Sequence, residues 1–295
     1  MQNSLEDKDW GMLLNRIKEG KCTPFLGAGA CYGVLPLGRD IAEQWAKAEE
    51  YPMSDSSDLV RVAQFLAVKY DPMYPKERIV EMFREAPSPD FDNPLEPHRV
   101  LADLPLPVYL TTNYDDFMVR ALQHRNRDPK QVLCRWNSAV SKGKYPNFEA
   151  KRDYSPTPAN PVVFYLHGHR EIAESLVLTE DDYLDFLVNI SRDESLLPPR
   201  IQRSLADASL MFIGYRLADW NFRTLFRGLV TATEASLRRI SITVQLPVPD
   251  VSEKARDEIQ SYLGDYFRKI DMRIFWGTAA DFVSELGRRW EAFDK

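Results

Sequence analysis

The sequence predicts an α/β fold in which a parallel sheet carries helices on both faces. Short apolar runs alternate with longer amphipathic segments along the 295 residues, which is the pattern of strands followed by helices. Several runs, such as 161–166, are apolar at successive positions, as is typical of strands buried on both faces. We expect a single domain over 1–295, with a helical insertion at about 51–96.

Apolar residues at helical spacing predict four helices in the first hundred residues. They are expected at 10–17, 41–48, 57–71 and 76–86. The run CTPFLGAGA at 22–30 lies between the first two and predicts a strand that ends in a glycine turn. Prolines separate and follow the last two helices, which make up the expected insertion.

Strands and helices alternate through the rest of the chain. Strands are expected at 107–115, 132–136, 161–169, 209–217, 240–247 and 272–277, with a further short one just before Thr179. Helices are expected at 115–123, 180–190, 219–234, 254–267 and 279–293. Thr179 and Asp182 have the spacing of an N-cap and its third helical residue. The polar, proline-containing segment 137–161 is expected to be an exposed loop.

The composition narrows the class of protein. With 38 Lys and Arg against 44 Asp and Glu, the net charge is −6, so we expect no direct nucleic-acid binding, which usually needs a basic surface. The three cysteines, Cys22, Cys31 and Cys134, form no CxxC pair, which argues against a zinc module and a disulfide framework. The N-terminus is polar and acidic, and no apolar stretch is long enough to span a membrane. We therefore expect a cytoplasmic protein.

Three short motifs follow three of the predicted strands directly. They are Gly27-Ala28-Gly29-Ala30, Thr111-Thr112-Asn113-Tyr114-Asp115 and Leu166-His167-Gly168. In open parallel sheets, ligands bind at the carboxyl ends of the strands. Because all three motifs come at such ends, the sequence predicts that they converge on one crevice.

The glycines of the first motif suit a phosphate. Gly27 and Gly29 permit close backbone approach, and a turn of this kind before a helix can hold a pyrophosphate through its N–H groups. The alternative is an ordinary turn between a strand and a helix. The full GxGxxG pattern is missing, and so is GxxxxGK[ST], which argues against a P-loop ATPase.

The other two motifs supply polar side chains for chemistry. The Asn113 amide can orient a ribose hydroxyl or a water, and Asp115 can accept a hydrogen bond from a carboxamide. Alternatively, either residue caps the helix that begins near Asp116. His167 is a candidate general base and His169 a second one, although a packed or surface histidine is the common case.

The remaining histidines, His98 and His124, are expected to be packed or surface residues rather than site residues.

The blocks GAGA, TTNYDD, LHG and FIGYRLADWNFR occur here in an order that resembles the sirtuin-like family. The match looks closer to the bacterial sirtuin-like domains of anti-phage defence systems than to protein deacetylases. The resemblance implies a Rossmann-like fold that binds NAD across the strand ends. It implies that Asn113 and His167 are catalytic and that Asp115 lies near the nicotinamide carboxamide. It further implies a nucleotide-binding set consisting of Gly27, Ala28, Gly29, Thr112, Gly214, Arg216 and Gly277.

The departures from the deacetylase pattern favour hydrolysis of NAD⁺ over deacylation. Deacetylases of the family carry a zinc module with two CxxC pairs, and this chain has none. Water is then the expected acceptor, so the resemblance implies an NAD⁺ hydrolase that releases nicotinamide and ADP-ribose, with no metal. The alternatives are an NAD-dependent deacylase or ADP-ribosyltransferase, and a non-catalytic NAD or ADP-ribose binding module. The resemblance also implies NAD depletion in anti-phage defence, a homo-oligomer, and a partner such as a HerA-type ATPase or an Argonaute-associated protein.

Overall fold

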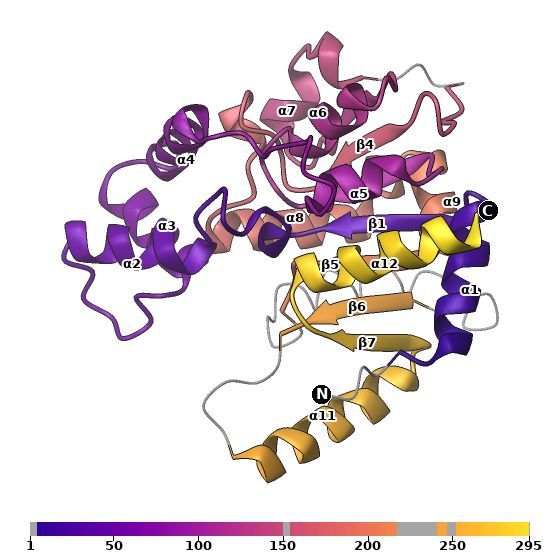
Figure 1. Ribbon diagram of the computed structural model, residues 1–295. Coiled ribbons are helices and arrows are strands. Elements are labelled where there is room, and N and C mark those ends of the chain that lie inside the picture. The colour runs from indigo at the N-terminus through magenta and orange to yellow at the C-terminus, as the bar shows by residue number, and fades with distance from the viewer. Residues whose placement is uncertain (1–4, 150–153, 217–240, 247–251, 295) are drawn as a thin grey trace.

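The protein is built on one sheet of seven parallel strands (Figure 1). The computed structural model describes residues 5–149, 154–216, 241–246 and 252–294. The strands are β1 (Cys22–Leu26), β2 (Val108–Thr111), β3 (Lys130–Leu133), β4 (Val162–Tyr165), β5 (Ser209–Ile213), β6 (Ser241–Gln245) and β7 (Met272–Trp276). They lie in the order β3-β4-β2-β1-β5-β6-β7. The prediction of a parallel sheet is confirmed.

Helices cover both faces of the sheet, as predicted. The described α-helices are α1 (Asp7–Lys18), α2 (Gly38–Ala48), α3 (Leu59–Lys69), α4 (Tyr74–Glu85), α5 (Pro97–Asp103), α6 (Phe117–His124), α7 (Ser138–Lys142), α8 (Glu180–Arg192), α9 (Pro199–Asp207), α11 (Glu253–Arg268) and α12 (Ala279–Phe293). Alternate strand residues enter two different cores. Tyr109 and Val163 pack with α1, α5, α6 and α12, whereas Val108 and Val162 pack with α8, α9 and α11. None of the described helices is long and apolar enough to cross a membrane.

The strand order gives the sheet a doubly wound, Rossmann-like topology. From β1 the chain builds β2, β3 and β4 on one side, and then returns to place β5, β6 and β7 on the other side. The direction of winding therefore reverses beside β1. In such sheets the ligand-binding crevice lies at this reversal, outside the carboxyl ends of the strands.

The expected helices of 57–71 and 76–86 are present as α3 and α4, and they form a third core together with α2. Trp45, Val62 and Ile79 are buried in this core, which also receives Phe117 at the start of α6. In Figure 1 these three helices lie beyond the carboxyl end of β1. They therefore adjoin the edge of the sheet at which the motifs end.

Two sequence expectations about irregular segments are wrong. Instead of a short strand before Thr179, the chain forms a 3₁₀ turn, η3 (Ala173–Ser175), and then a stretch that is not a strand, although the Val177 amide donates to the His167 carbonyl at 3.0 Å. The neighbouring β4 is already paired on both sides, by β2 and β3, so no edge is free there. The segment 137–161 is not simply an exposed loop, because it contains α7 and the 3₁₀ turn η2 (Pro146–Phe148). Its apolar side chains, Val140 and Phe148, are buried in the core.

The predictions for individual helices were confirmed in one case, incomplete in two and untested in one. The capping of α8 is confirmed, since Thr179 Oγ1 accepts from the Asp182 amide at 3.1 Å and Asp182 Oδ2 accepts from the Thr179 amide at 3.0 Å. Sequence reasoning missed α5 and α9, which are short and have proline in the first turn. The helix expected at 219–234 lies outside the described residues.

Candidate active site at the carboxyl edge of the sheet

The register of the strands brings the predicted motifs to one level. Leu26 pairs with Thr111 on β2 and with Ile213 on β5, and Thr111 pairs with Tyr165 on β4. The residues that directly follow these paired positions are Gly27, Thr112, Leu166 and Gly214. One residue further along their strands come Asn113 and His167, at matching positions on neighbouring strands. The structure therefore brings the three motifs and Gly214 together at one edge.

The Asn113 side chain is held across the gap between β1 and β2. Its amide nitrogen, Nδ2, donates to the Gly27 carbonyl at 3.1 Å and to Cys31 Sγ at 3.3 Å. The Asn113 backbone amide donates to Thr111 Oγ1 at 2.9 Å. The side chain is half-buried, so the amide has a fixed orientation and remains partly accessible.

Asp115 has the capping role that the sequence left open as an alternative. Its Oδ1 accepts from the Phe117 amide at 2.9 Å at the start of α6, and its Oδ2 accepts from the Cys31 thiol at 3.3 Å. Burial raises the pKa of that thiol well above its ordinary value, and the Asp115 charge adds to the effect. Asp115 itself is only 5% exposed, so in this conformation its carboxylate faces the protein interior.

Sequence reasoning did not count Cys31 and His98 among the site residues. His98 is buried, as expected, but it adjoins the site, because its Nε2 lies 3.9 Å from Cys31 Sγ. Its Nδ1 lies 2.7 Å from Glu96 Oε1. Burial lowers the pKa of His98, but the Glu96 and Asp115 carboxylates outweigh that effect and raise it overall. The one sequence signal for this group was that Cys31 directly follows the glycine motif.

The glycines of the first motif pack against the turn after β5. The Gly27 amide donates to the Ile213 carbonyl at 2.9 Å, and the Gly29 amide donates to the Gly214 carbonyl at 3.0 Å. Gly214 has a φ of +85°, and a Cβ placed on it would lie 2.4 Å from the Ala30 nitrogen. The amides of Gly27 and Gly29 are thus already bonded, and in this conformation they are not free to hold a phosphate. Ala28, between them, is exposed.

Tyr215 lies on the glycine turn and was also missed. Its hydroxyl donates to the Leu26 carbonyl at 2.7 Å and lies 2.8 Å from Thr112 Oγ1. A Cβ placed on Gly27 would lie only 2.8 Å from the Tyr215 ring. Thr112, which was predicted to bind the nucleotide, therefore has its hydroxyl bonded to this tyrosine.

His167 is enclosed by helix α8. The imidazole is 5% exposed and packs edge-on against Tyr183 and Phe186, with ring centroids 5.2 Å and 5.0 Å away. Within the part of the chain that is described, its Nε2 has no hydrogen-bond partner. Burial lowers the pKa of His167 to about 3, so the ring is neutral near pH 7. A neutral imidazole nitrogen can accept a hydrogen bond, but a general base needs a pKa near the working pH, which the enclosed His167 does not have in this conformation.

The other predicted site residues have different surroundings. His169 packs between Phe148 and Tyr165 rather than beside His167. Arg216 is exposed. Gly277 follows β7, and its amide donates to the Gln245 carbonyl at 2.8 Å. Since β7 is three strands from β1, at about 4.8 Å per strand, Gly277 can contact only a distant part of a long ligand.

Comparison with known proteins shows which family this chain is similar to. The model of the SIR2-like domain family matches residues 107–267. A curated relative from Cytobacillus dafuensis, NAD(+) hydrolase ThsA, is 26% identical over 208 residues, which are 70% of this chain and 37% of the relative. A protein of the same name from Bacillus cereus (strain MSX-D12) is 24% identical over 92% of this chain and 50% of the relative.

Two more matches extend the comparison. Defense-associated sirtuin 2 from Bacillus subtilis is 26% identical over 70% of this chain and 19% of its own length. The chain thus spans half or less of the length of these curated relatives. A solved Sir2 enzyme structure covers 98% of this chain and 99% of its own, with a TM-score of 0.43 and 12% identity.

Proposed function

Because the chain belongs to the SIR2-like domain family, we propose that it hydrolyses NAD⁺ at the bond between nicotinamide and ribose. The products are nicotinamide and ADP-ribose. The observation that carries the proposal is that Asn113 and His167 each follow by two residues the paired ends of β2 and β4, with the Asn113 amide donating to the Gly27 carbonyl of the glycine turn. The names of the ThsA relatives, NAD(+) hydrolases, support it.

The reaction makes modest chemical demands that these residues fit. Nicotinamide leaves as a neutral molecule, and cleavage of such a glycosidic bond passes through an oxocarbenium-like transition state. The Asn113 amide orients the ribose or the attacking water. His167 accepts the proton of that water, directly or through a ribose hydroxyl, once its ring is released from the packing against Tyr183 and Phe186 that lowers its pKa. Asp115 holds the nicotinamide carboxamide once its carboxylate is turned toward the ligand.

The rest of the edge suits the nucleotide. Ala28 and the Gly214–Arg216 turn lie beside β1 and β5 and are assigned to the pyrophosphate. Gly277, three strands away, is assigned to the far end of the ligand.

The test is nicotinamide release from NAD⁺ by the purified chain. Asn113→Ala is expected to lower the rate by at least a hundredfold, since it removes the orienting amide. Asn189→Ala is the matched control, because Asn189 Nδ2 also donates to a backbone carbonyl, that of Trp136 at 3.0 Å, but lies outside the site. Equal rates for the Asn113 variant and the unmodified protein would rule out the proposal.

A second candidate is a binding module that holds NAD or ADP-ribose without cleaving it. The observations that favour it are the bonded amides of Gly27 and Gly29 and the enclosure of His167 by Tyr183 and Phe186. Calorimetric binding of NAD⁺ that is followed by no nicotinamide release would select this candidate. A deacylase or ADP-ribosyltransferase has less support, because the chain has no CxxC pair. Transfer to an acetylated peptide or to a protein acceptor would identify it.

The proposed hydrolysis of NAD⁺ also leads to a proposal for the protein's biological role. We assign the reaction to anti-phage defence in the cytoplasm by NAD depletion, with support from the relative named Defense-associated sirtuin 2. An enzyme that consumes a cell's own NAD⁺ needs control. Homo-oligomerisation and a second protein, such as a HerA-type ATPase or an Argonaute-associated protein, are the proposed sources of that control. Size-exclusion chromatography with light scattering, alone and with the partner, tests both.

A further inference from the structure

A group of buried side chains with metal-binding atoms lies directly behind Asn113. Cys31, His98 and Asp115 come from three separate elements, and each is at most 5% exposed. Their ligand atoms all lie within 4.8 Å of one another. Asn113 Nδ2, 3.3 Å from Cys31 Sγ, connects the group to the carboxyl edge of the sheet.

The distances within the group are close to those of a tetrahedral zinc site. Usual zinc bonds to sulfur, nitrogen and oxygen at tetrahedral angles place the ligand atoms about 3.4–3.6 Å apart. Here Cys31 Sγ lies 3.3 Å from Asp115 Oδ2 and 3.9 Å from His98 Nε2. The ligand atoms of His98 and Asp115 also lie within 4.8 Å of each other, so side-chain movements can bring all three atoms to bonding distance of one ion.

The surroundings of His98 match those of a metal-binding histidine. Such a histidine generally gives its second ring nitrogen to a carboxylate, which fixes the tautomer and orients the free nitrogen toward the metal. Glu96 Oε1 lies 2.7 Å from His98 Nδ1. Glu96 is itself fixed, because its Oε2 accepts from the Arg99 amide at 2.6 Å. His98 Nε2 therefore faces Cys31 with a defined orientation.

One buried carboxylate of the group, that of Asp115, has no ion-pair partner among the described residues. Two buried carboxylates, Glu96 and Asp115, belong to the group. Among the described residues, no lysine or arginine forms an ion pair with either of them, and the ion-pair partner of Glu96 is His98. Buried carboxylates are ordinarily paired with a cation or bound to a metal.

We propose that Cys31, His98 and Asp115 bind one Zn²⁺ ion, with Glu96 orienting His98. A cysteine, a histidine and a carboxylate are together a ligand set that suits zinc. The fourth position is left to water or to a ligand atom from the carboxyl edge. The Cys31 thiol, and His98 Nε2 where the ring is protonated, release their protons to solvent as sulfur and nitrogen bind the metal.

Zinc at this place has a consequence that rests on the proposed function. The ion engages Asp115, which we assign to the nicotinamide carboxamide, and it takes the sulfur that now accepts from Asn113. Bound zinc is therefore expected to inhibit NAD⁺ cleavage. Binding and inhibition are measured separately, so that failure of one is distinguishable from failure of the other.

The test uses the full chain, stripped of metal with a chelator and titrated with Co²⁺ in the absence of NAD⁺. A thiolate-to-cobalt charge-transfer band in the near ultraviolet is expected at one cobalt per chain, and Zn²⁺ is expected to abolish it. Cys31→Ser is expected to remove the band. Glu96→Gln is expected to keep the band but to weaken zinc affinity about 10- to 100-fold, as loss of such an outer partner does.

Cys134→Ser is the matched control, because Cys134 is also a buried cysteine but lies outside the group. It is expected to keep both the band and the affinity. No band in the unmodified protein overturns the proposal, and so does a band that survives Cys31→Ser or disappears in Cys134→Ser. If Cys31→Ser does not fold, the zinc affinity of Glu96→Gln tests the proposal instead. An affinity equal to that of the unmodified protein then overturns it. If bound zinc leaves the rate of NAD⁺ cleavage unchanged, or if the metal-free protein does not cleave NAD⁺ either, the metal site stands and only the inhibition is lost.

Discussion

At the residue scale, Gly214 shows why the first motif and the turn after β5 both need glycine. A Cβ on Gly214 would lie 2.6 Å from the Gly27 carbonyl oxygen, and a Cβ on Gly29 would lie 2.9 Å from the Gly214 Cα. The two turns pack backbone against backbone, which only glycine permits. The glycines that predicted a phosphate site are therefore needed in part because the two turns pack closely against each other.

Gly214→Ala is expected to destabilise the protein by more than about 2 kcal/mol, because alanine is strained at positive φ and its Cβ would contact backbone. Gly264→Ala is the control, since Gly264 lies inside α11 with nothing near its missing Cβ. That change is expected to stabilise the helix by about 0.5–1 kcal/mol. Urea unfolding measures both, and a neutral Gly214→Ala contradicts the packing argument.

The buried histidines give the protein a defined sensitivity to acid. Burial lowers the pKa of His167 and of His169 from 6.5 to about 3. The unfolded chain therefore binds more protons below pH 6.5 than the folded chain does, and stability falls as the pH falls from 6.5 toward 3. Each histidine contributes a slope of at most about 1.4 kcal/mol per pH unit.

His167→Gln and His169→Gln are each expected to make the free energy of unfolding less dependent on pH between 6.5 and 4. Denaturant unfolding at a series of pH values gives the slopes. Identical slopes for the unmodified protein and the two buried variants exclude this origin of acid sensitivity.

Sequence reasoning found the residues that directly follow strands and missed those that reach the site from elsewhere. Asn113 and His167 were predictable because a buried apolar run ends just before each of them. Tyr215 was not, because its significance comes from contacts with Leu26 and Thr112, far away in the sequence. His98 was assigned only a packing role, because nothing in the sequence shows that α5 places it beside Cys31.

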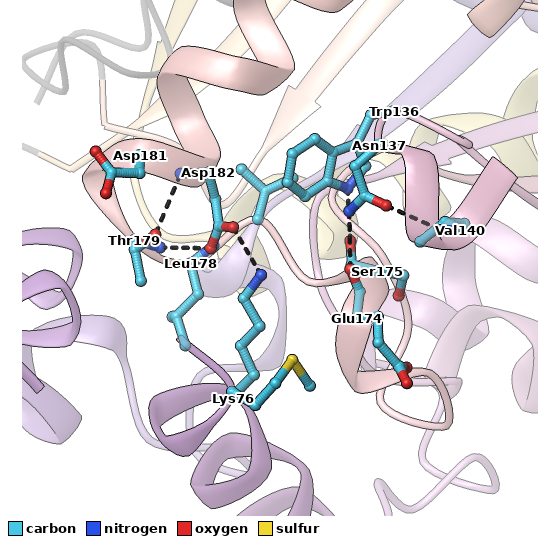
Figure 2. A network of polar contacts seen from close by, with 12 residues as sticks. Lys76, Trp136, Asn137, Val140, Glu174, Ser175, Leu178, Thr179, Asp181 and Asp182 are labelled. Atoms are coloured by element: carbon cyan, nitrogen blue, oxygen red, sulfur yellow. Dashed lines mark hydrogen bonds and ion pairs between the residues drawn. The ribbon is translucent and has the colours of Figure 1, made fainter. Parts of the chain in front are cut away.

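At the element scale, α8 connects the site to the helices of the expected insertion. Tyr183 and Phe186 of this helix enclose His167. Figure 2 shows Lys76 of α4 extended toward Asp182, in the first turn of α8. Lys76 Nζ lies 2.6 Å from Asp182 Oδ1, and the two side chains are 7% and 13% exposed. The ion pair fixes α4 against the helix that encloses His167.

Lys76→Met is expected to cost about 1–3 kcal/mol of stability. The loss stays below the 3–5 kcal/mol typical of breaking a buried pair, because Asp182 Oδ2 keeps its bonds to the Leu178 and Thr179 amides. Lys254→Met is the control, since Lys254 is 89% exposed in its ion pair, and a change below about 0.5 kcal/mol is expected. Chemical denaturation measures the free energy of unfolding of both variants. Equal losses would show that the buried ion pair does not contribute to stability.

Other elements show where periodicity is and is not informative. A strand such as β4 was predictable because its successive positions are apolar, and the long helices because their apolar spacing repeats over three turns. The seven-residue α5 has too few turns for a periodic signal. The expected strand before Thr179 failed for another reason. Its residues are apolar enough, but only the sheet order shows that β4 has no free edge.

At the scale of the whole molecule, the two ends of the described chain share one core. Trp10 of α1 stacks on Phe282 of α12 with ring centroids 5.6 Å apart, and it meets Phe275 of β7 edge-on at 6.3 Å. Arg289 of α12 lies over the Trp10 ring at 5.0 Å. Phe117, which belongs to the third core, begins the helix whose next residues, Met118 and Val119, enter this one. Such continuity supports the expectation of one domain over 1–295.

That expectation predicts cooperative unfolding. Trp10→Ala is expected to cost about 3–5 kcal/mol, because it removes a buried aromatic side chain. If the chain is one folding unit, the slowest-exchanging amides of α3 lose the same amount of protection as those of β1, although α3 is far from Trp10 in the sequence. Hydrogen exchange with mass spectrometry measures both segments in one experiment. Met12→Ala, on the exposed side of α1, is expected to change neither. If β1 loses protection and α3 keeps it, the helices of 51–96 form a separate folding unit, and control of the site through α8 would not require unfolding of the sheet.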